Sequence, residues 1–225
     1  MKHIVILTGG YLNIRFAKEY MKTLSCDKVF AVDKGLEYAE ALGIVPDYII
    51  GDFDTVDKIL LESYEKQIAQ GKKCAYLDRY PAKKDATDTE LAILKAIEEK
   101  AGKITLLAAS GGRIDHMLAN LNLLLLTGQA GIECYIVDET NRVRLLDSAD
   151  NRPCIIQKKE QYGTYLSLIP ITEFIEGLTI TGVMYPLYKK KVYQGNSLTV
   201  SNRIVDKETR ISLDKGKVLI IESMD

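Results

Sequence analysis

The sequence predicts an α/β N-terminal domain with a parallel sheet, followed by an all-β sandwich C-terminal domain. In the first half of the chain, short continuous apolar runs alternate with amphipathic segments of helical period. That alternation is typical of parallel strands that helices cover on both faces. From about residue 140, the segments become short and rich in β-branched residues, and turns containing Gly, Asn or Pro separate them. This second pattern predicts antiparallel strands, and the polar stretch 138–150 separates predicted domains 1–140 and 141–225.

The elements follow from the same periodicities. In the first half we predict strands at 3–9, 28–33, 47–52, 74–78, 103–110 and 132–138, and helices at 12–24, 35–43, 56–70, 88–102 and 115–131. Glycines close several of these helical segments, as is usual at helix C-termini. In the second half we predict strands at 142–147, 153–157, 164–171, 177–182, 197–205, 209–213 and 217–223.

The composition argues against several broad classes of function. With 225 residues, 47% hydrophobic content and a net charge of −1, the chain can form a packed core and has no basic excess for nucleic acid. No apolar stretch is long enough for a membrane helix, and the first is too short for a signal peptide, so we expect a cytoplasmic protein. The four scattered cysteines favour free thiols over disulfides or a zinc site.

Carboxylates or glycines follow the carboxyl ends of most of the predicted parallel strands. In open α/β sheets, ligands bind at that edge. We therefore expect a binding site there, built from residues in four parts of the first domain. These residues are Asp33, then Asp52 and Asp54, then Asp85 and Asp88, and finally Gly111, Gly112, Arg113 and Asp115.

Asp52 and Asp54 follow the apolar run "YIIG". If the strand continues through them, both side chains point to one side, roughly 6–7 Å apart along the chain. At an effective dielectric constant near 20, two such charges repel by about 2–3 kcal/mol, and a bound divalent cation would reverse that sign. Magnesium typically takes one or two carboxylates together with substrate phosphates. An exposed acidic turn, in which water screens the charges, explains the pair equally well.

The segment "KKDATDTELAI" (83–93) has a structural interpretation. Thr87 and Glu90 fit a capping box, with Thr87 as the N-cap of the helix. Asp88 would then complement the helix dipole. For these three residues alone we favour this interpretation, but capping does not explain Asp85.

The segment "SGGRIDHMLANL" (110–121) is more specific for a ligand. Gly111 and Gly112 let the backbone approach a bound group, and the helix that follows offers N–H groups to a phosphate. Arg113 adds a bidentate donor, and Asp115 is either an N-cap or a metal-facing carboxylate. We favour structural roles for His116 and Asn120. An acidic pocket facing such an anion cradle suits phosphoryl chemistry with Mg²⁺.

Four sets of residues together resemble the thiamine pyrophosphokinase family. They are "PDYIIGDFDT" (46–55), "DATDTELAI" (85–93), "SGGRIDHMLANLNLL" (110–124), and "GLTITGVMYPL" (177–187) with "SLTVSNRI" (197–204). Each is modest alone, but they occur in the family's order along almost the whole chain. The resemblance implies an α/β nucleotide-binding domain followed by a β-sandwich. It also implies Mg²⁺-dependent transfer of a pyrophosphoryl group from ATP to the thiamine hydroxyl, which gives thiamine diphosphate and AMP.

The resemblance also implies roles for individual residues. Asp52 and Asp54 would hold or face the magnesium ion and act in catalysis, with Asp85 assisting. The nucleotide-binding set would be Asp33, Asp88, Gly111, Gly112, Arg113 and Asp115. Ser201 and Asn202 match the family's "SN" pair at the thiamine site, which lies at the subunit interface of a homodimer. Where the family often has a doubled glycine after the aspartate of the second strand, this chain has Lys34 and Gly35.

Some alternatives stay open. A pocket carboxylate could accept the proton of the thiamine hydroxyl, and we favour Asp54. The main rival function is a phosphatase of the haloacid dehalogenase type, in which "DFDTV" (52–56) is the nucleophile loop and Asp52 is phosphorylated. That loop usually follows the first strand, whereas two predicted strands precede it here. A second rival is a sensor that binds nucleotide or thiamine without catalysis.

Overall fold

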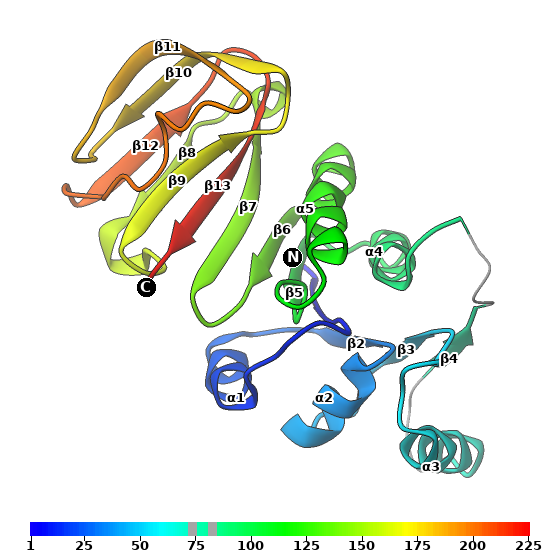
Figure 1. Ribbon diagram of the computed structural model, residues 1–225. Coiled ribbons are helices and arrows are strands. Elements are labelled where there is room, and N and C mark those ends of the chain that lie inside the picture. Colours follow the sequence, from blue (N-terminus) through cyan, green and yellow to red (C-terminus); the bar gives the residue numbers. More distant parts are fainter. Residues whose placement is uncertain (72–75, 81–84) are drawn as a thin grey trace. The chain divides into compact units, whose positions relative to one another are not determined.

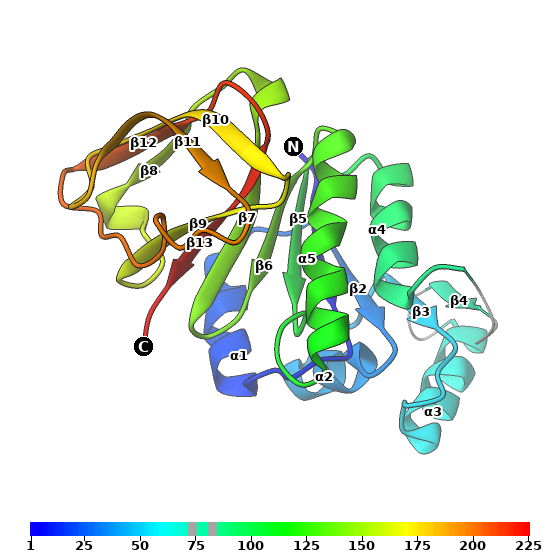
Figure 2. The same cartoon turned by 45° about the horizontal axis from the view of Figure 1, so that its top comes forward.

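The computed structural model describes residues 1–71, 76–80 and 85–225. The chain divides into two compact units, Met1–Glu139 and Thr140–Asp225. The first contains parallel strands and helices, and the second contains antiparallel strands and two short 3-10 turns (Figures 1 and 2). The predicted fold class is therefore confirmed.

Six parallel strands form the sheet of the first unit, in the order β4-β3-β2-β1-β5-β6. Because β5 returns to the far side of β1, the strand order reverses between these two strands, and such a switch point opens a crevice for ligands. The strands are β1 (His3–Leu7), β2 (Lys28–Val32), β3 (Tyr48–Gly51), β4 (Tyr76–Arg79), β5 (Lys103–Leu107) and β6 (Glu133–Val137). The first two residues of the predicted strand 74–78 lie outside the described residues.

Helices cover both faces of this sheet (Figure 1). α1 (Ile14–Thr23), α2 (Gly35–Leu42) and α3 (Lys58–Ala69) lie on one face, and α4 (Asp88–Glu98) and α5 (Ile114–Gln129) lie on the other. Strand β1 is buried along its whole length, as a central parallel strand should be. Between the sheet and helices α2 and α3, a cluster that includes Leu36, Ile49 and Tyr64 fills the core. The capping prediction for Thr87 is confirmed, because its hydroxyl accepts a hydrogen bond from the Glu90 N–H at 3.2 Å.

The second unit is a sandwich of two antiparallel sheets. One has the order β7-β13-β9 and the other β11-β10-β12-β8. The strands are β7 (Asn141–Asp147), β8 (Cys154–Gln157), β9 (Tyr165–Pro170), β10 (Phe174–Thr181), β11 (Leu187–Tyr193), β12 (Glu208–Ser212) and β13 (Lys217–Ser223). Both sheets contribute to one apolar core, with Leu168 and Ile220 from the first and Leu178 and Ile211 from the second.

In this unit one strand prediction is wrong, and one strand was not predicted. The segment 197–205 forms no regular strand and takes part only in isolated bridges, such as Leu166 with Asn202 and Val183 with Ile204. The unpredicted strand is β11, which pairs with β10 at the edge of the sheet; its sequence "LYKKKVY" carries three lysines and buries only Val192. β11 is an edge strand, and lysines on an edge oppose further strand pairing. Its polar sequence therefore lacks the apolar alternation on which strand prediction depends.

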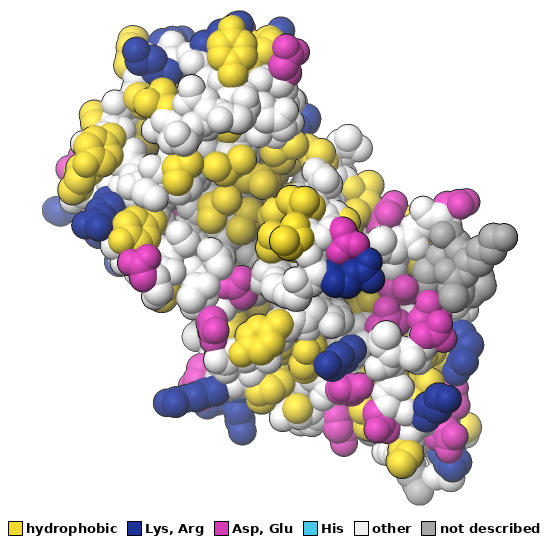
Figure 3. Space-filling model, viewed as in Figure 1, with side chains coloured by type: hydrophobic (Ala, Val, Ile, Leu, Met, Phe, Trp, Pro, Cys, Tyr) yellow, Lys and Arg dark blue, Asp and Glu magenta, His cyan; other side chains and the backbone are white. Residues whose placement is uncertain are grey.

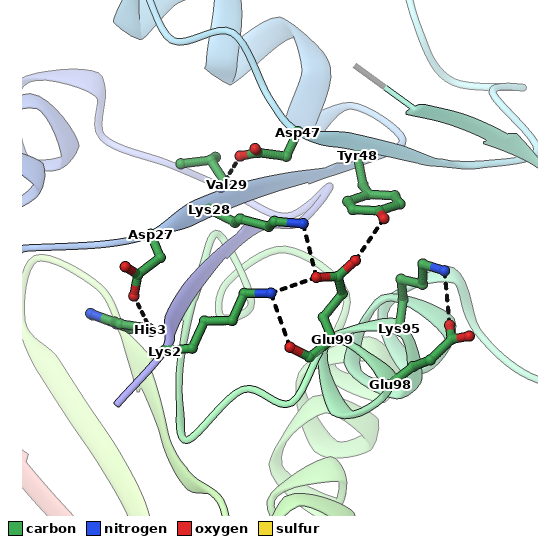
Figure 4. Close-up of polar contacts among 10 residues, drawn as sticks. All are labelled: Lys2, His3, Asp27, Lys28, Val29, Asp47, Tyr48, Lys95, Glu98 and Glu99. Atoms are coloured by element: carbon green, nitrogen blue, oxygen red, sulfur yellow. Dashed lines mark hydrogen bonds and ion pairs between the residues drawn. The ribbon is translucent and has the colours of Figure 1, made fainter. Parts of the chain in front are cut away.

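A charged cluster ties the amino-terminal edge of the parallel sheet to the end of α4 (Figure 4). The Glu99 carboxylate contacts the ammonium groups of Lys2 at 2.5 Å and Lys28 at 2.8 Å, and it accepts a hydrogen bond from the Tyr48 hydroxyl at 2.7 Å. The hydrogen bonds from Lys2, Lys28 and Tyr48 lower the pKa of Glu99 to about 2. Residues at the starts of three strands thus share one acceptor.

We predict that Glu99→Gln destabilises the protein by about 1–2 kcal/mol at pH 7, because it removes the charge from this shared acceptor. Since folding lowers the Glu99 pKa from 4.5 to about 2, the stabilisation is fully present above 4.5 and is lost as pH falls toward 2. Urea unfolding at pH 7 and at stepwise lower pH measures this difference. Glu98→Gln is the matched control, because Glu98 is exposed and pairs only with Lys95 among its described neighbours. An equal effect of both substitutions at pH 7, or a difference that does not shrink in acid, would contradict the assignment.

Candidate active site

A cavity of about 670 Å³ lies at the carboxyl edge of the parallel sheet, within the first unit. Its walls come from the loops after β1, β2, β3 and β5 and from the first turns of α4 and α5. Of the predicted site residues, Asp33, Asp52, Asp88, Gly111, Gly112 and Arg113 line it. Asp54, Asp85 and Asp115 are not among the lining residues, and all three are exposed. The structure therefore brings six of the nine predicted residues of this unit to one cavity.

The floor of the cavity is a close crossing of the loops after β1 and β5. Gly10 donates its N–H to the Ala108 carbonyl at 2.9 Å, and the Thr8 hydroxyl donates to the same oxygen at 2.5 Å. A Cβ atom built on Gly10 would lie 2.2 Å from that oxygen, so no larger residue fits without displacing backbone. The neighbouring Gly9 has no such restriction, because its nearest contact would be 3.8 Å away.

Asp33 connects the ends of β2 and β3. Its backbone has a φ of 48°, and its N–H donates to the Ile50 carbonyl at 3.0 Å. Its carboxylate accepts a hydrogen bond from the Phe53 N–H at 3.4 Å. A Cβ atom on Gly51 would lie 1.9 Å from Asp33 Oδ1, so the glycine leaves room for this carboxylate. Asp33 therefore shapes the turn that carries Asp52.

Asp52 and Asp54 do not continue the strand. β3 ends at Gly51, and Phe53 is buried with a φ of 64°, which turns the chain sharply between the two aspartates. The Asp54 N–H then donates to Asp52 Oδ1 at 3.0 Å. The strand therefore does not continue through both aspartates, as the prediction that their side chains point to one side required. Asp52 lines the cavity, whereas Asp54 is exposed on the turn.

The glycine-rich turn after β5 leads directly into α5. Gly111 and Gly112 both have positive φ, at 79° and 72°, and both are exposed along the cavity. Arg113 is the N-cap of α5, and its guanidinium binds Asp115 through two contacts of 3.1 and 2.5 Å. Hydrogen bonding to Arg113 lowers the pKa of Asp115 to about 2. Asp115 therefore orients Arg113 rather than lining the cavity itself.

Several lining residues were not predicted as site residues. His116 and Asn120 line the cavity, although the sequence favoured structural roles for both. Buried Asn120 also has a structural role, because its side-chain N–H donates to the Ala109 carbonyl at 2.9 Å. Tyr11 and Tyr38 line the cavity from the first loop and from α2. The glycine pair Gly9–Gly10 after the first strand is the sequence signal that could have indicated this wall.

The described residues include no group of three or more His, Cys, Asp or Glu side chains placed to hold a metal ion. Of the predicted metal ligands, Asp52 lies in the cavity wall, where Asp33 and Asp88 are further carboxylates. Mg²⁺ typically binds one or two carboxylates and completes its shell with water and substrate phosphates. These donors fit a magnesium ion that arrives with a polyphosphate, and they do not form a metal cage by themselves.

In the second unit, Ser201 and Asn202 lie in a turn segment rather than at a strand end. Ser201 is exposed with a φ of 60°, and its N–H donates to the Ser167 hydroxyl at 2.9 Å. Asn202 is buried, and its amide group exchanges hydrogen bonds with the backbone of Tyr185, at 3.1 and 2.8 Å. Asn202 thus fixes the segment that presents Ser201 and Tyr185 to solvent.

The surface of the first unit carries both signs of charge. On the side drawn in Figure 3, acidic and basic side chains are interspersed, so this face shows no continuous basic patch. Among the described residues, none of the helices combines the length and the apolar character needed to cross a lipid bilayer.

Comparison with known families decides between the possible reaction classes. The family model described as "Thiamin pyrophosphokinase, catalytic domain" matches residues 20–136, and "Thiamin pyrophosphokinase, vitamin B1 binding domain" matches residues 153–218. The chain belongs to the thiamine pyrophosphokinase family. The resemblance seen in the sequence is therefore confirmed, and the chain is an enzyme of this family. The haloacid dehalogenase alternative finds no support in these comparisons.

Thiamine pyrophosphokinases of known sequence and structure agree with both units. Thiamine pyrophosphokinase of Bacillus subtilis (strain 168) is 31% identical over 230 residues, which cover 100% of each chain. A crystal structure of thiamine pyrophosphokinase from Bacillus subtilis superposes with a TM-score of 0.86 at 29% identity, again over 100% of both chains. The Geobacillus thermodenitrificans structure gives a TM-score of 0.81 at 30% identity, with 99% of this chain and 98% of that chain covered.

We predict that Gly10→Ala lowers the free energy of unfolding by about 1–3 kcal/mol, because the added methyl group overlaps the Ala108 carbonyl at the floor of the cavity. Gly9→Ala is the control, since its methyl group meets only ordinary contacts. Urea unfolding of both variants measures the difference. Equal stability of the two variants would show that the crossing relaxes without cost.

Proposed function

We propose that this enzyme transfers a pyrophosphoryl group from ATP to the hydroxyl of thiamine with the help of Mg²⁺, giving thiamine diphosphate and AMP. The observation that carries the proposal is the composition of the cavity in the unit that matches the family's catalytic domain. One wall provides carboxylates, and the other provides a glycine-rich turn with an arginine. These are the complementary parts that a metal-bound polyphosphate requires.

The glycine-rich turn would bind the phosphate chain of ATP. Gly111 and Gly112 have no side chains to block the approach of phosphate oxygens to the backbone. The start of α5 would add N–H donors, although the His116 N–H already donates to Asp115 Oδ1. Arg113, which Asp115 orients, would add charge-assisted hydrogen bonds. Asp33 and Asp88 would complete the nucleotide-binding wall from the ends of β2 and the start of α4.

Asp52 is the residue best placed to hold Mg²⁺, with Asp54 and Asp85 as further proposed ligands. When bound, Mg²⁺ would neutralise charge on the phosphate chain as the reaction proceeds. The thiamine hydroxyl oxygen forms a bond to the β-phosphorus. The bond from that phosphorus to the oxygen it shares with the α-phosphorus breaks, and this oxygen leaves with AMP. A carboxylate of the acidic wall accepts the hydroxyl proton. Of the two aspartates after β3, only Asp52 lines the cavity, so the geometry does not favour Asp54, the proton acceptor that the sequence suggested.

Ser201 and Asn202 are the proposed thiamine-binding residues. The match of this unit to a vitamin B1 binding domain supports their place in the unit that recognises thiamine. Because tryptophan is absent from the chain, any aromatic contact with thiamine must come from tyrosine or phenylalanine.

We further propose a homodimer with the thiamine site at the subunit interface, and a cytoplasmic location. The described cysteines Cys26, Cys134 and Cys154 are free, and Cys74 lies outside the described residues.

The reaction products provide the direct test. We expect purified protein with thiamine, ATP and Mg²⁺ to form AMP and thiamine diphosphate in equal amounts, and we expect EDTA to stop both. Separation of nucleotides and thiamine esters by chromatography measures the ratio. Inorganic phosphate with ADP would reject pyrophosphoryl transfer, whereas binding of both substrates without AMP would support a sensor.

Variants of Asp52 and Asp54 separate the roles of the two aspartates in the turn after β3. We predict that Asp52→Asn lowers kcat by about 10²–10⁴-fold, because it removes the carboxylate that lines the cavity. The asparagine keeps an oxygen that can accept the Asp54 N–H, so the turn should persist. We expect Asp54→Asn to lose less kcat than Asp52→Asn, because Asp54, although a further proposed ligand, is exposed outside the cavity wall. Single-turnover assays measure both, and a larger loss in Asp54→Asn would return the proton-accepting role to that residue.

A further inference from the structure

Lys34 lines the same cavity and has no role in the reaction as described so far. It is the one lysine among the lining residues that the structure describes, and Arg113 is the one arginine. Arg113 is already bound to Asp115 by two contacts. The Lys34 ammonium group forms no hydrogen bond or ion pair with any residue that the structure describes. It is therefore the unpaired cation of this wall.

The backbone fixes where the Lys34 side chain begins. Lys34 is the N-cap residue of α2, with φ −56° and ψ −16°, and it follows the left-handed Asp33. Gly35 packs so closely on β1 that a Cβ atom there would lie 2.0 Å from the Leu7 carbonyl oxygen. On the other side, a Cβ atom on Gly9 would lie 3.8 Å from the Lys34 Cβ. The stem of Lys34 therefore starts beside the glycine pair after β1, at the cavity wall.

The charges that line the cavity indicate what a lysine at position 34 would do there. Asp33, Asp52 and Asp88 present three carboxylates to a ligand that itself carries several negative charges. A single metal ion offsets only part of the repulsion between these carboxylates and a polyphosphate. A lysine contributes a compact charge and three donors on a flexible stem, which can follow phosphate groups as they move during transfer.

We propose that Lys34 binds the phosphate chain of the nucleotide and sets the affinity of this enzyme for it. This inference rests on the proposed function and deepens it, because it assigns a specificity-determining residue to the same cavity. The contact is directed at phosphate, so its contribution grows with the number of phosphate groups. The contact does not involve thiamine, because the thiazolium ring of thiamine is positively charged and would repel the lysine.

The test compares Lys34→Gln and Lys34→Arg with the wild type. We expect Lys34→Gln to raise the KM for Mg²⁺-ATP about tenfold or more, which is the usual scale for losing a charged hydrogen bond, with the KM for thiamine changed less than about twofold. Lys34→Arg should recover part of the affinity. The matched control is Lys18→Gln, because Lys18 is exposed on α1 and does not line the cavity.

Calorimetric binding of ATP, ADP, AMP and adenosine identifies the group that Lys34 contacts. The loss in Lys34→Gln should be largest for ATP, smaller for ADP and AMP, and absent for adenosine. Rising salt should weaken ATP binding more in the wild type than in the variant. An unchanged KM for Mg²⁺-ATP, or an equal loss for adenosine, would overturn the inference. A wild type that forms no thiamine diphosphate would instead contradict the proposed function, so the two failures are distinguishable.

Discussion

The close approach of backbone to backbone at the carboxyl edge of the parallel sheet is the constraint on which the cavity depends. Gly10 meets the Ala108 carbonyl and Gly35 meets the Leu7 carbonyl at distances that leave no room for a Cβ atom. These two contacts bring the loops after β1, β2 and β5 together around one volume. The close packing of backbone at two glycines therefore helps to set the positions of the loops that carry the site residues.

The two edges of the sheet divide stability and function between them. At the amino-terminal edge, Glu99 collects two ammonium groups and a hydroxyl, so the charges there satisfy one another. At the carboxyl edge, Asp33, Asp52 and Asp88 come from separate loops and line a shared cavity together with Lys34 and Arg113. The charges at one edge thus contact one another, whereas those at the other edge line a cavity that can admit a ligand.

Periodicity predicted most of the fold because most elements bury one face or both. The parallel strands appear as continuous apolar runs, and the N-cap of α4 follows from Thr87 and the spacing to Glu90. β11 escaped prediction because an edge strand with three lysines buries almost nothing. The segment 197–205 resembled a strand because Thr199, Asn202 and Ile204 are buried, but the chain there turns repeatedly and forms only isolated bridges.

The candidate site was harder to predict, because it depends on turns and on contacts between loops rather than on periodic burial. Alternation in the sequence suggested that Asp52 and Asp54 would point to one side, but a left-handed Phe53 between them turns the chain. Neighbours in space also escaped notice where each is ordinary alone, as with Tyr11 and Tyr38. Sequence spacing specifies residues along one loop, whereas a cavity is specified by which loops the sheet brings together.

The absence of a three-ligand metal cluster among the described residues has a thermodynamic consequence. If the protein contributes only one or two carboxylates to Mg²⁺, water and the phosphates of the nucleotide would complete the coordination shell. Metal and nucleotide then raise each other's affinity by the same factor, because binding free energies are reciprocal. The acidic wall would therefore repel free nucleotide and accept the metal complex. In the proposed reaction, selection of the metal-bound substrate would follow from keeping the carboxylates on separate loops.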